Sequence, residues 1–314
     1  MANKPTFEGI YPAIITPMTE KGEVHEEAFR AMLEDNIRCG IHGFWTAGGT
    51  GESVMLTDEE NTRIAKIAAD QNKGRSTIIM HVGAITTDRA VKNAENAAKA
   101  GVEALCAVPP FFVRPGDDAV VEHYRAIGAA TNLPLMVYNL PQATQIEITV
   151  DLMKKLQDKV PQMVGLKHSA LNFNNMIWFS EMGLKVLTGS GMLLFPALTV
   201  GASGTVDGPP SVAPELWMEI WNAWKAGDLK RGVAAQRKAN DLFNLILKYG
   251  YMGSMKAMIS ERTGIECGNP RRPVLPMSAE NRKAINKVCE EWGITGAGKH
   301  DFKRTLKTAA AAKK

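Results

Sequence analysis

Short apolar runs alternate with longer segments of helical period along the first two-thirds of the chain. The runs have the length of buried strands and are bounded by glycine, proline and polar turn residues. They lie at 11–16, 43–46, 77–82, 104–108, 135–138, 163–167, 185–188 and 204–206. Segments in which apolar residues recur with the period of a helix lie between them, at 26–39, 58–71, 88–100, 119–130 and 150–159.

Eight strands separated by helices, at a spacing of roughly 25 to 30 residues, are typical of a (β/α)8 TIM barrel. A doubly wound open sheet would alternate in the same way, but no glycine-rich dinucleotide loop follows the first strand. We therefore predict an α/β fold in which residues 1–212 form a TIM barrel, with the active site at the carboxyl ends of its strands.

The remainder of the chain is predicted to be helical. Apolar and aromatic residues recur at helical spacing in 214–226, and two more helical segments are predicted at 228–249 and 279–292. We expect residues 213–298 to form a C-terminal helical bundle packed on the barrel. Residues 299–314 contain six lysines and arginines against one aspartate, so we expect a basic, disordered tail, to which we assign no function.

Charge and cysteine usage narrow the class of protein. The formal net charge is +4. Because the basic tail accounts for this charge, the rest of the chain shows no nucleic-acid-binding footprint. The four cysteines form no CxxC pair, so neither a zinc site nor a disulfide framework is predicted. Neither a secretory signal nor an apolar stretch of membrane-spanning length is found. We expect a cytoplasmic protein with no membrane or nucleic-acid partner.

Lys167 stands at the end of the apolar run 163–167. Burial of a lysine as a cation is costly, which drives the amine toward its neutral, nucleophilic form. A single lysine at a strand end more often points to solvent, so the neighbouring strand ends must decide between the two. Our hypothesis is that Lys167 attacks the carbonyl of a 2-oxo acid and forms a Schiff base.

The other predicted strand ends carry groups that this chemistry needs. The loop 48–53 holds Gly49 and Thr50, whose backbone N–H groups and hydroxyl suit a substrate carboxylate. Tyr138, which ends the fifth strand, is a candidate for proton transfer. Candidate substrate-binding side chains follow or end the last three strands: Ser169, Ser190 and Asp207.

Five short motifs occur in the order of these strand ends. They lie at 12–17, 48–52, 109–115, 138–141 and 165–167. In this combination the chain resembles the pyruvate-dependent class I aldolases and lyases, a family that includes dihydrodipicolinate synthase and N-acetylneuraminate lyase. The resemblance implies that Lys167 is the Schiff-base lysine, Tyr138 the proton-transfer residue, and Gly49 with Thr50 the carboxylate-binding loop. It also implies pyruvate and an aldehyde as partners, no cofactor or metal, and a homo-oligomer, often a tetramer.

Departures from the family pattern concern the second substrate. Dihydrodipicolinate synthases have an arginine where this chain has Ala143, and hydroxyl groups of a proton relay where it has Gly49 and Phe112. The chain is therefore not expected to be a typical synthase. Ser169 and the stretch 251–276 are more similar to the lyase branch.

The sialic acid lyases have an acidic pair where this chain has Gly191 and Met192, so N-acetylneuraminate is not implied either. The polar side chains of Ser169, Ser190 and Asp207 nevertheless suit a hydroxylated substrate. The leading hypothesis is a Schiff-base-forming aldolase or lyase. It would cleave a 2-oxo-3-deoxy sugar acid to pyruvate and an aldehyde, or dehydrate that acid through the same imine.

Two alternatives remain open at this point. A metal-dependent barrel lyase could use four side chains near strand ends, although the sequence lacks the usual His-x-His pair. These side chains are Glu52, His81, His168 and Asp207. A binding protein that has kept the barrel is the other alternative, because the relay hydroxyls are missing at Gly49 and Phe112.

Overall fold

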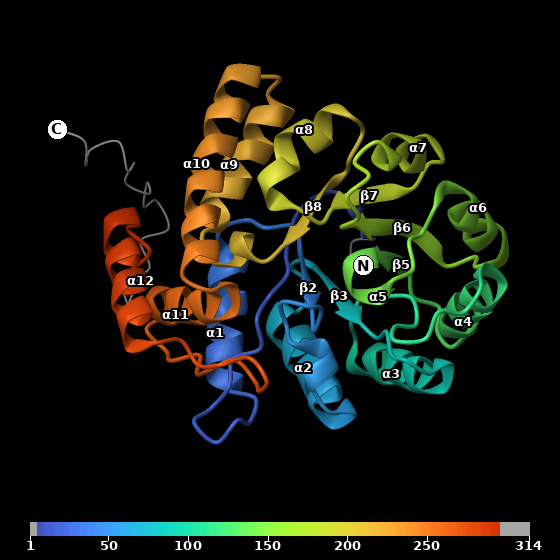
Figure 1. Ribbon diagram of the computed structural model, residues 1–314, viewed down its shortest axis with the longest axis horizontal. Coiled ribbons are helices and arrows are strands. Elements are labelled where there is room, and N and C mark those ends of the chain that lie inside the picture. Colours follow the sequence, from blue (N-terminus) through green and yellow to red (C-terminus); the bar gives the residue numbers. More distant parts are fainter. Residues whose placement is uncertain (1–4, 296–314) are drawn as a thin grey trace.

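The computed structural model describes residues 5–295, and eight parallel strands form a barrel at its centre (Figure 1). The strands are β1 Gly9–Pro12, β2 Gly43–Thr46, β3 Thr77–His81, β4 Ala104–Ala107, β5 Leu135–Asn139, β6 Met163–His168, β7 Lys185–Thr188 and β8 Gly204–Asp207. Their order is β1-β8-β7-β6-β5-β4-β3-β2. An isolated bridge between Ala13 and Trp45 joins the β1 and β2 sides. The predicted TIM barrel is confirmed.

Helices surround the barrel and extend it at the C-terminal side (Figure 1). Those up to the last strand are α1 Glu26–Arg38, α2 Asp58–Asn72, α3 Thr87–Ala100, α4 Asp117–Ala129, α5 Pro141–Thr144, α6 Val150–Lys159, α7 Asn175–Glu181 and α8 Leu194–Thr199. Those that follow are α9 Pro214–Lys225, α10 Leu229–Lys248, α11 Tyr251–Thr263 and α12 Ala279–Trp292. Short 3-10 turns occur at η1 Ser53–Met55, η2 Gly191–Leu193 and η3 Pro209–Ser211.

The first strand and one helix differ from the sequence-based prediction. The predicted bounds of the first strand, 11–16, were wrong, because its ladder with β8 covers Gly9–Pro12 and only an isolated bridge from Ala13 to Trp45 of β2 follows. Helix α11 was not predicted. Most of its residues are buried, including Lys256 and Arg262, so it has no polar face that would reveal a helical period.

The relation between the barrel and the C-terminal helices centres on α9. This helix contacts both β1 and α10, and α11 contacts α1. A division after residue 212 therefore stays a prediction. The predicted tail 299–314 lies outside the described residues.

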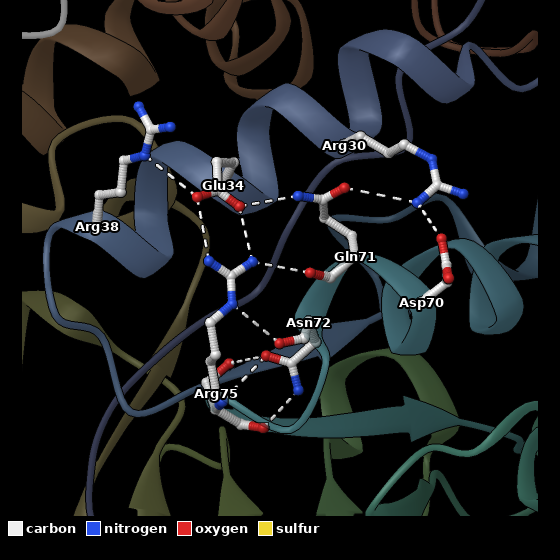
Figure 2. A network of polar contacts seen from close by, with 8 residues as sticks. Arg30, Glu34, Arg38, Asp70, Gln71, Asn72 and Arg75 are labelled. Carbon is white, nitrogen blue, oxygen red and sulfur yellow. Dashed lines mark hydrogen bonds and ion pairs between the residues drawn. The ribbon is translucent and has the colours of Figure 1, made fainter.

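A polar network joins α1 to the end of α2 (Figure 2). The Arg75 guanidinium donates to both carboxylate oxygens of Glu34, at 3.1 and 2.7 Å, and to the Asn72 carbonyl at 3.1 Å. The hydrogen bonds that the Arg75 guanidinium donates lower the pKa of the Glu34 carboxyl to about 2, because they outweigh burial, which raises it. Because these side chains are partly exposed, we expect the network to fix the angle between the helices more than to add stability.

Two apolar clusters make up the core. One lies between the strands and the surrounding helices. The other fills the barrel and includes Tyr11, Trp45, Ile79, Cys106, Met136, Tyr138, Leu187 and Val206. The polar groups at the carboxyl ends of the strands therefore lie next to the packed apolar interior of the barrel. No helix within residues 5–295 has both the length and the apolar character needed to cross a membrane.

Candidate active site

Lys167 lies inside the barrel, near the carboxyl end of β6. Strand register places it beside Tyr138 of β5 and Leu187 of β7. Its side chain is buried, and Nζ lies 4.3 Å from the centre of the Tyr138 ring and 5.4 Å from that of Trp45. The Trp45 and Tyr138 rings meet edge to face, with centroids 5.5 Å apart. The amine therefore lies against two aromatic rings that hold each other in place.

Two titratable side chains near Lys167 are held in their neutral forms. Burial, together with the charge of Lys167, lowers the pKa of His81 on β3 to about 4. The Val108 N–H donates to Nε2 of this imidazole at 3.4 Å. Burial raises the pKa of the Cys106 thiol on β4 well above its ordinary value, against the effect of Lys167. Near neutral pH, His81 therefore places no positive charge beside the amine and Cys106 no negative charge.

Asp207 ends β8, and its carboxylate accepts backbone N–H groups from Gly191 at 2.6 Å and from Gly208 at 2.7 Å. Burial raises the pKa of this carboxyl, whereas the two N–H groups and Lys167 oppose the rise. The Trp217 indole N–H donates to the Gly191 carbonyl at 3.2 Å. Asp207 therefore joins the loops after β7 and β8 and places a carboxyl group in the field of Lys167.

The loop 48–53 follows β2 and lies across from Tyr138. A Cβ on Gly49, which is exposed, would lie 3.7 Å from the Tyr138 hydroxyl oxygen. The Glu52 N–H donates to the Gly49 carbonyl at 3.1 Å, and the Ser53 N–H to that of Gly48 at 3.2 Å. The loop is thus folded on itself, with Gly49 turned toward the tyrosine.

Tyr251, the first residue of α11, is a residue of the site that sequence reasoning missed. Its hydroxyl oxygen lies 3.3 Å from Thr50 Oγ1, and a Cβ on Gly208 would overlap it. Burial, and after it the charge of Asp207, raises the pKa of Tyr251. The residue begins the stretch 251–276 that resembles the lyase branch, but its spacing from the strand ends carries no signal.

The two candidate serines also lie at the carboxyl end of the barrel. Ser169 directly follows β6, and its side chain rests against Gly189, where a Cβ would overlap it. Ser190 follows β7, and its N–H donates to Thr188 Oγ1 at 3.3 Å. Both serines are half-buried. All seven predicted site residues therefore stand at the carboxyl ends of strands, with Lys167 and Tyr138 in direct contact.

The four side chains of the metal hypothesis do not form a ligand set. The imidazole of His168 faces away from Lys167, with Nδ1 3.3 Å from the Asn139 amide and Nε2 2.9 Å from the Asn172 carbonyl. Glu52 forms an ion pair with Lys256 at 2.7 Å. Within residues 5–295, no three histidine, cysteine or acidic side chains are grouped so that they could hold a metal ion. The geometry does not favour this alternative.

The fold and the site define a (β/α)8-barrel protein with a buried lysine at the carboxyl end of β6. The chain belongs to the dihydrodipicolinate synthetase family, whose model matches residues 6–292.

Named relatives come from both branches of the family. The chain is 28% identical to a 4-hydroxy-tetrahydrodipicolinate synthase of Oleidesulfovibrio alaskensis, over 92% of this chain and 99% of the relative. The solved dihydrodipicolinate synthase of Aquifex aeolicus matches with a TM-score of 0.85 at 27% identity, covering 92% of this chain and 98% of that one. A Clostridium difficile protein, CdNal, solved in complex with mannosamine, matches with a TM-score of 0.86 at 25% identity, covering 90% and 98%.

Proposed function

We propose that this protein is a class I aldolase or lyase that forms a Schiff base between Lys167 and a 2-oxo acid, with pyruvate as the common unit. The observation that carries the proposal is the position of the Lys167 amine, which is buried against the rings of Trp45 and Tyr138, together with the Tyr138 hydroxyl beside Gly49. An amine in this position can act as the nucleophile that attacks the carbonyl of a bound 2-oxo acid.

The proposed reaction begins with attack of the Lys167 amine on the C2 carbonyl. One proton moves from the attacking nitrogen to the carbonyl oxygen to give a carbinolamine, and a second proton on this hydroxyl lets it leave as water, which gives a protonated imine. Tyr138 is suited to carry these protons, because its hydroxyl lies beside Gly49 and its ring contacts the amine. In cleavage, a base removes the proton of the C4 hydroxyl and the C3–C4 bond electrons move into the imine. The aldehyde leaves, and protonation and hydrolysis of the enamine release pyruvate.

Dehydration would use the same intermediate. Loss of a C3 proton gives the enamine, whose electrons expel the C4 hydroxyl as water after protonation. Both routes need the imine as an electron sink, and neither assigns a step to a metal or an organic cofactor.

We infer that the second half of the substrate is hydroxylated. Ser169, Ser190 and Asp207 offer hydroxyls and a carboxyl around the opening, and a relative at 25% identity was solved with mannosamine, an amino sugar. Ala143, on the exposed part of α5, offers no charge for a second carboxylate. A 2-oxo-3-deoxy sugar acid is therefore the substrate class that we propose.

A synthase that condenses pyruvate with a second substrate is the competing activity, because the relative at 28% identity carries that name. It would use the same imine at Lys167. Against it stand Ala143, Gly49 and Phe112, which lack the arginine and the relay hydroxyls. A binding protein without catalysis is the third possibility, and formation of the imine separates it from the other two.

Borohydride trapping tests the proposal. The protein is incubated with pyruvate and sodium borohydride, its intact mass is taken, and the modified peptide is mapped. We expect a reduced pyruvyl adduct on Lys167, and none in Lys167→Ala. Lys185→Ala is the matched control, since this lysine begins the neighbouring strand and pairs with Glu8 at 2.6 Å. No adduct on the folded wild type would overturn the proposal and favour the binding protein.

Once an adduct is found, aldehydes and 2-oxo-3-deoxy acids are screened. Turnover of hydroxylated substrates supports the lyase. A requirement for a second carboxylate supports the synthase instead.

We also infer a homo-oligomer in the cytoplasm, with four subunits by resemblance. Four apolar side chains near the barrel opening are well exposed, and that of Phe112 is 93% exposed. The others are Val54, Ile85 and Val113. Exposed apolar side chains of this size favour association between subunits.

A further inference from the structure

Helix α11 contacts the loop 48–53 at two points. The Tyr251 hydroxyl lies 3.3 Å from Thr50 Oγ1, and the Lys256 ammonium forms an ion pair with Glu52 at 2.7 Å. The two contacts come from residues separated from the loop by about two-thirds of the chain, and Gly49, which faces Tyr138, lies next to Thr50. A helix outside the ring of strands therefore contacts the loop on either side of Gly51 in sequence, at Thr50 and at Glu52.

The Lys256–Glu52 pair is almost completely buried, with side-chain exposures of 1% and 0%. Besides the ion pair, Lys256 Nζ donates to the carbonyls of Thr16 at 2.8 Å and Asn269 at 3.1 Å. The other carboxylate oxygen of Glu52 accepts the Arg271 N–H at 2.5 Å. The pair is thus surrounded by groups that fix its geometry.

A buried ion pair of this kind is a weak source of stability. The loss of hydration on burying both charges is comparable to the attraction between them, and replacement by apolar residues is often neutral or stabilising. Burial lowers the pKa of Lys256, although Glu52 opposes the shift, which indicates that the cost of burial is felt at this site. The pair is therefore better explained by what it positions.

What it positions is the backbone of the loop. Glu52 has a left-handed backbone conformation, with φ of 65°. The ion pair with Lys256 holds the Glu52 side chain and can thereby maintain this conformation. On the other side, the Thr16 hydroxyl donates to the Gly51 carbonyl at 2.7 Å, while the Thr16 carbonyl accepts from Lys256. Lys256 therefore holds Glu52 directly and Gly51 through Thr16.

We propose that Lys256 and Glu52 are positioning residues, which hold the loop 48–53 in the conformation that binds the carboxylate of the 2-oxo acid. They touch neither the amine nor the proposed substrate, and they act through the backbone of Gly51 and Glu52. This inference rests on the proposed function, since it assigns the loop to the carboxylate of the substrate that Lys167 attacks.

The test compares two carbonyl compounds with borohydride trapping at Lys167. Pyruvate carries a carboxylate and hydroxyacetone does not. In Lys256→Met and Glu52→Gln, we expect the concentration of pyruvate that gives half-maximal trapping to rise at least about tenfold, while the rate of hydroxyacetone trapping stays within about twofold of the wild type. A tenfold change in half-saturation corresponds to about 1.4 kcal/mol of lost carboxylate binding.

Arg262→Met is the matched control. It removes another buried cation from the same helix, but its partners are Asp35 of α1 and Glu215 of α9 rather than the loop. We expect it to lower stability without changing half-saturation by pyruvate. An unchanged pyruvate value in Lys256→Met, an equal loss for both carbonyl compounds, or the same rise in Arg262→Met would overturn the positioning role.

Two further outcomes are decisive. If neither Lys256→Met nor Glu52→Gln folds, the pair supports the whole fold and the specific role is overturned. If the wild type forms no pyruvyl adduct, the proposed function fails. Backbone hydrogen exchange then tests whether the Lys256–Glu52 pair holds the conformation of the loop 48–53. Faster backbone exchange confined to 48–53 in Glu52→Gln would support that role, and unchanged exchange would overturn it.

Discussion

Burial of His81 beside Lys167 makes stability depend on pH. The pKa of this imidazole is about 4 in the folded protein, against about 6.5 in an unfolded chain. Between these values the unfolded state binds more protons than the folded state. The free energy of unfolding therefore decreases as pH falls from about 6.5 toward 4, and the contribution of His81 is fully present above pH 6.5.

The contribution of His81 is expected to fall by about 2 kcal/mol between pH 8 and pH 5. His123, whose pKa burial also lowers to about 4, adds a loss of the same sign. Urea unfolding at both pH values should show this decrease in the wild type, and a decrease smaller by about 2 kcal/mol in His81→Gln. An equal decrease in the two proteins would show that His81 titrates normally in the fold.

At the scale of one element, the close pairing of β6 with β7 depends on Gly165, two residues before Lys167. A Cβ at this position would overlap the carbonyl of Lys185 on β7, and it would meet the Lys185 side chain at 3.0 Å. Backbone atoms of a neighbouring strand cannot move aside cheaply. Since Gly165 and Lys167 are on the same strand face, a shift of β6 is transmitted to the amine.

Gly165→Ala should destabilise the protein by about 3 kcal/mol, at the upper end of the usual cost of overpacking. It should also reduce trapping of pyruvate at Lys167. Thermal unfolding and the trapping assay measure the two effects. Gly116→Ala is the control, because a Cβ there meets no atom within 4 Å, and its melting temperature should stay close to that of the wild type. A stable Gly165→Ala would mean that β6 and β7 can separate at little cost.

At the scale of the whole molecule, Arg262 ties the C-terminal helices to the barrel. From α11 its guanidinium donates to Asp35 of α1 and, at 2.7 Å, to Glu215 of α9. It also donates to the carbonyl of Val212 at 3.3 Å. Because these partners belong to both parts of the chain, we expect the barrel and the C-terminal helices to unfold together.

Arg262→Met should lower the free energy of unfolding by about 3 to 5 kcal/mol, because it takes the guanidinium away from the buried carboxylate of Asp35 and the partly buried one of Glu215. Arg282→Met removes a partly exposed ion pair to Glu266 and should cost less than about 1 kcal/mol. Denaturant unfolding, followed by both tryptophan fluorescence and circular dichroism, should give one transition in each variant. Two separated transitions in Arg262→Met would instead indicate that the C-terminal helices fold independently.

The amino-acid sequence by itself determined most of the barrel. Seven of the eight strands lie at the short apolar runs that turn residues bound. Helices such as Val150–Lys159 begin and end as the periodic pattern predicts. Lys167 and Tyr138 were found as candidates because a lysine and a tyrosine at the ends of apolar strands are chemically conspicuous. Their proposed roles await the trapping experiment. These features could be predicted because strand and helix periods are local properties of the chain.

Only the tertiary structure decided which groups surround the candidate site. Tyr251 and Lys256 lie on a helix that is too thoroughly buried to show a period, and they reach the loop 48–53 across about 200 residues of sequence. The buried carboxyl of Asp207 faces backbone N–H groups that no residue pattern encodes. Contacts of this kind depend on how the barrel closes and on which helix covers it. They arise from packing between distant segments, which sequence periodicity does not record.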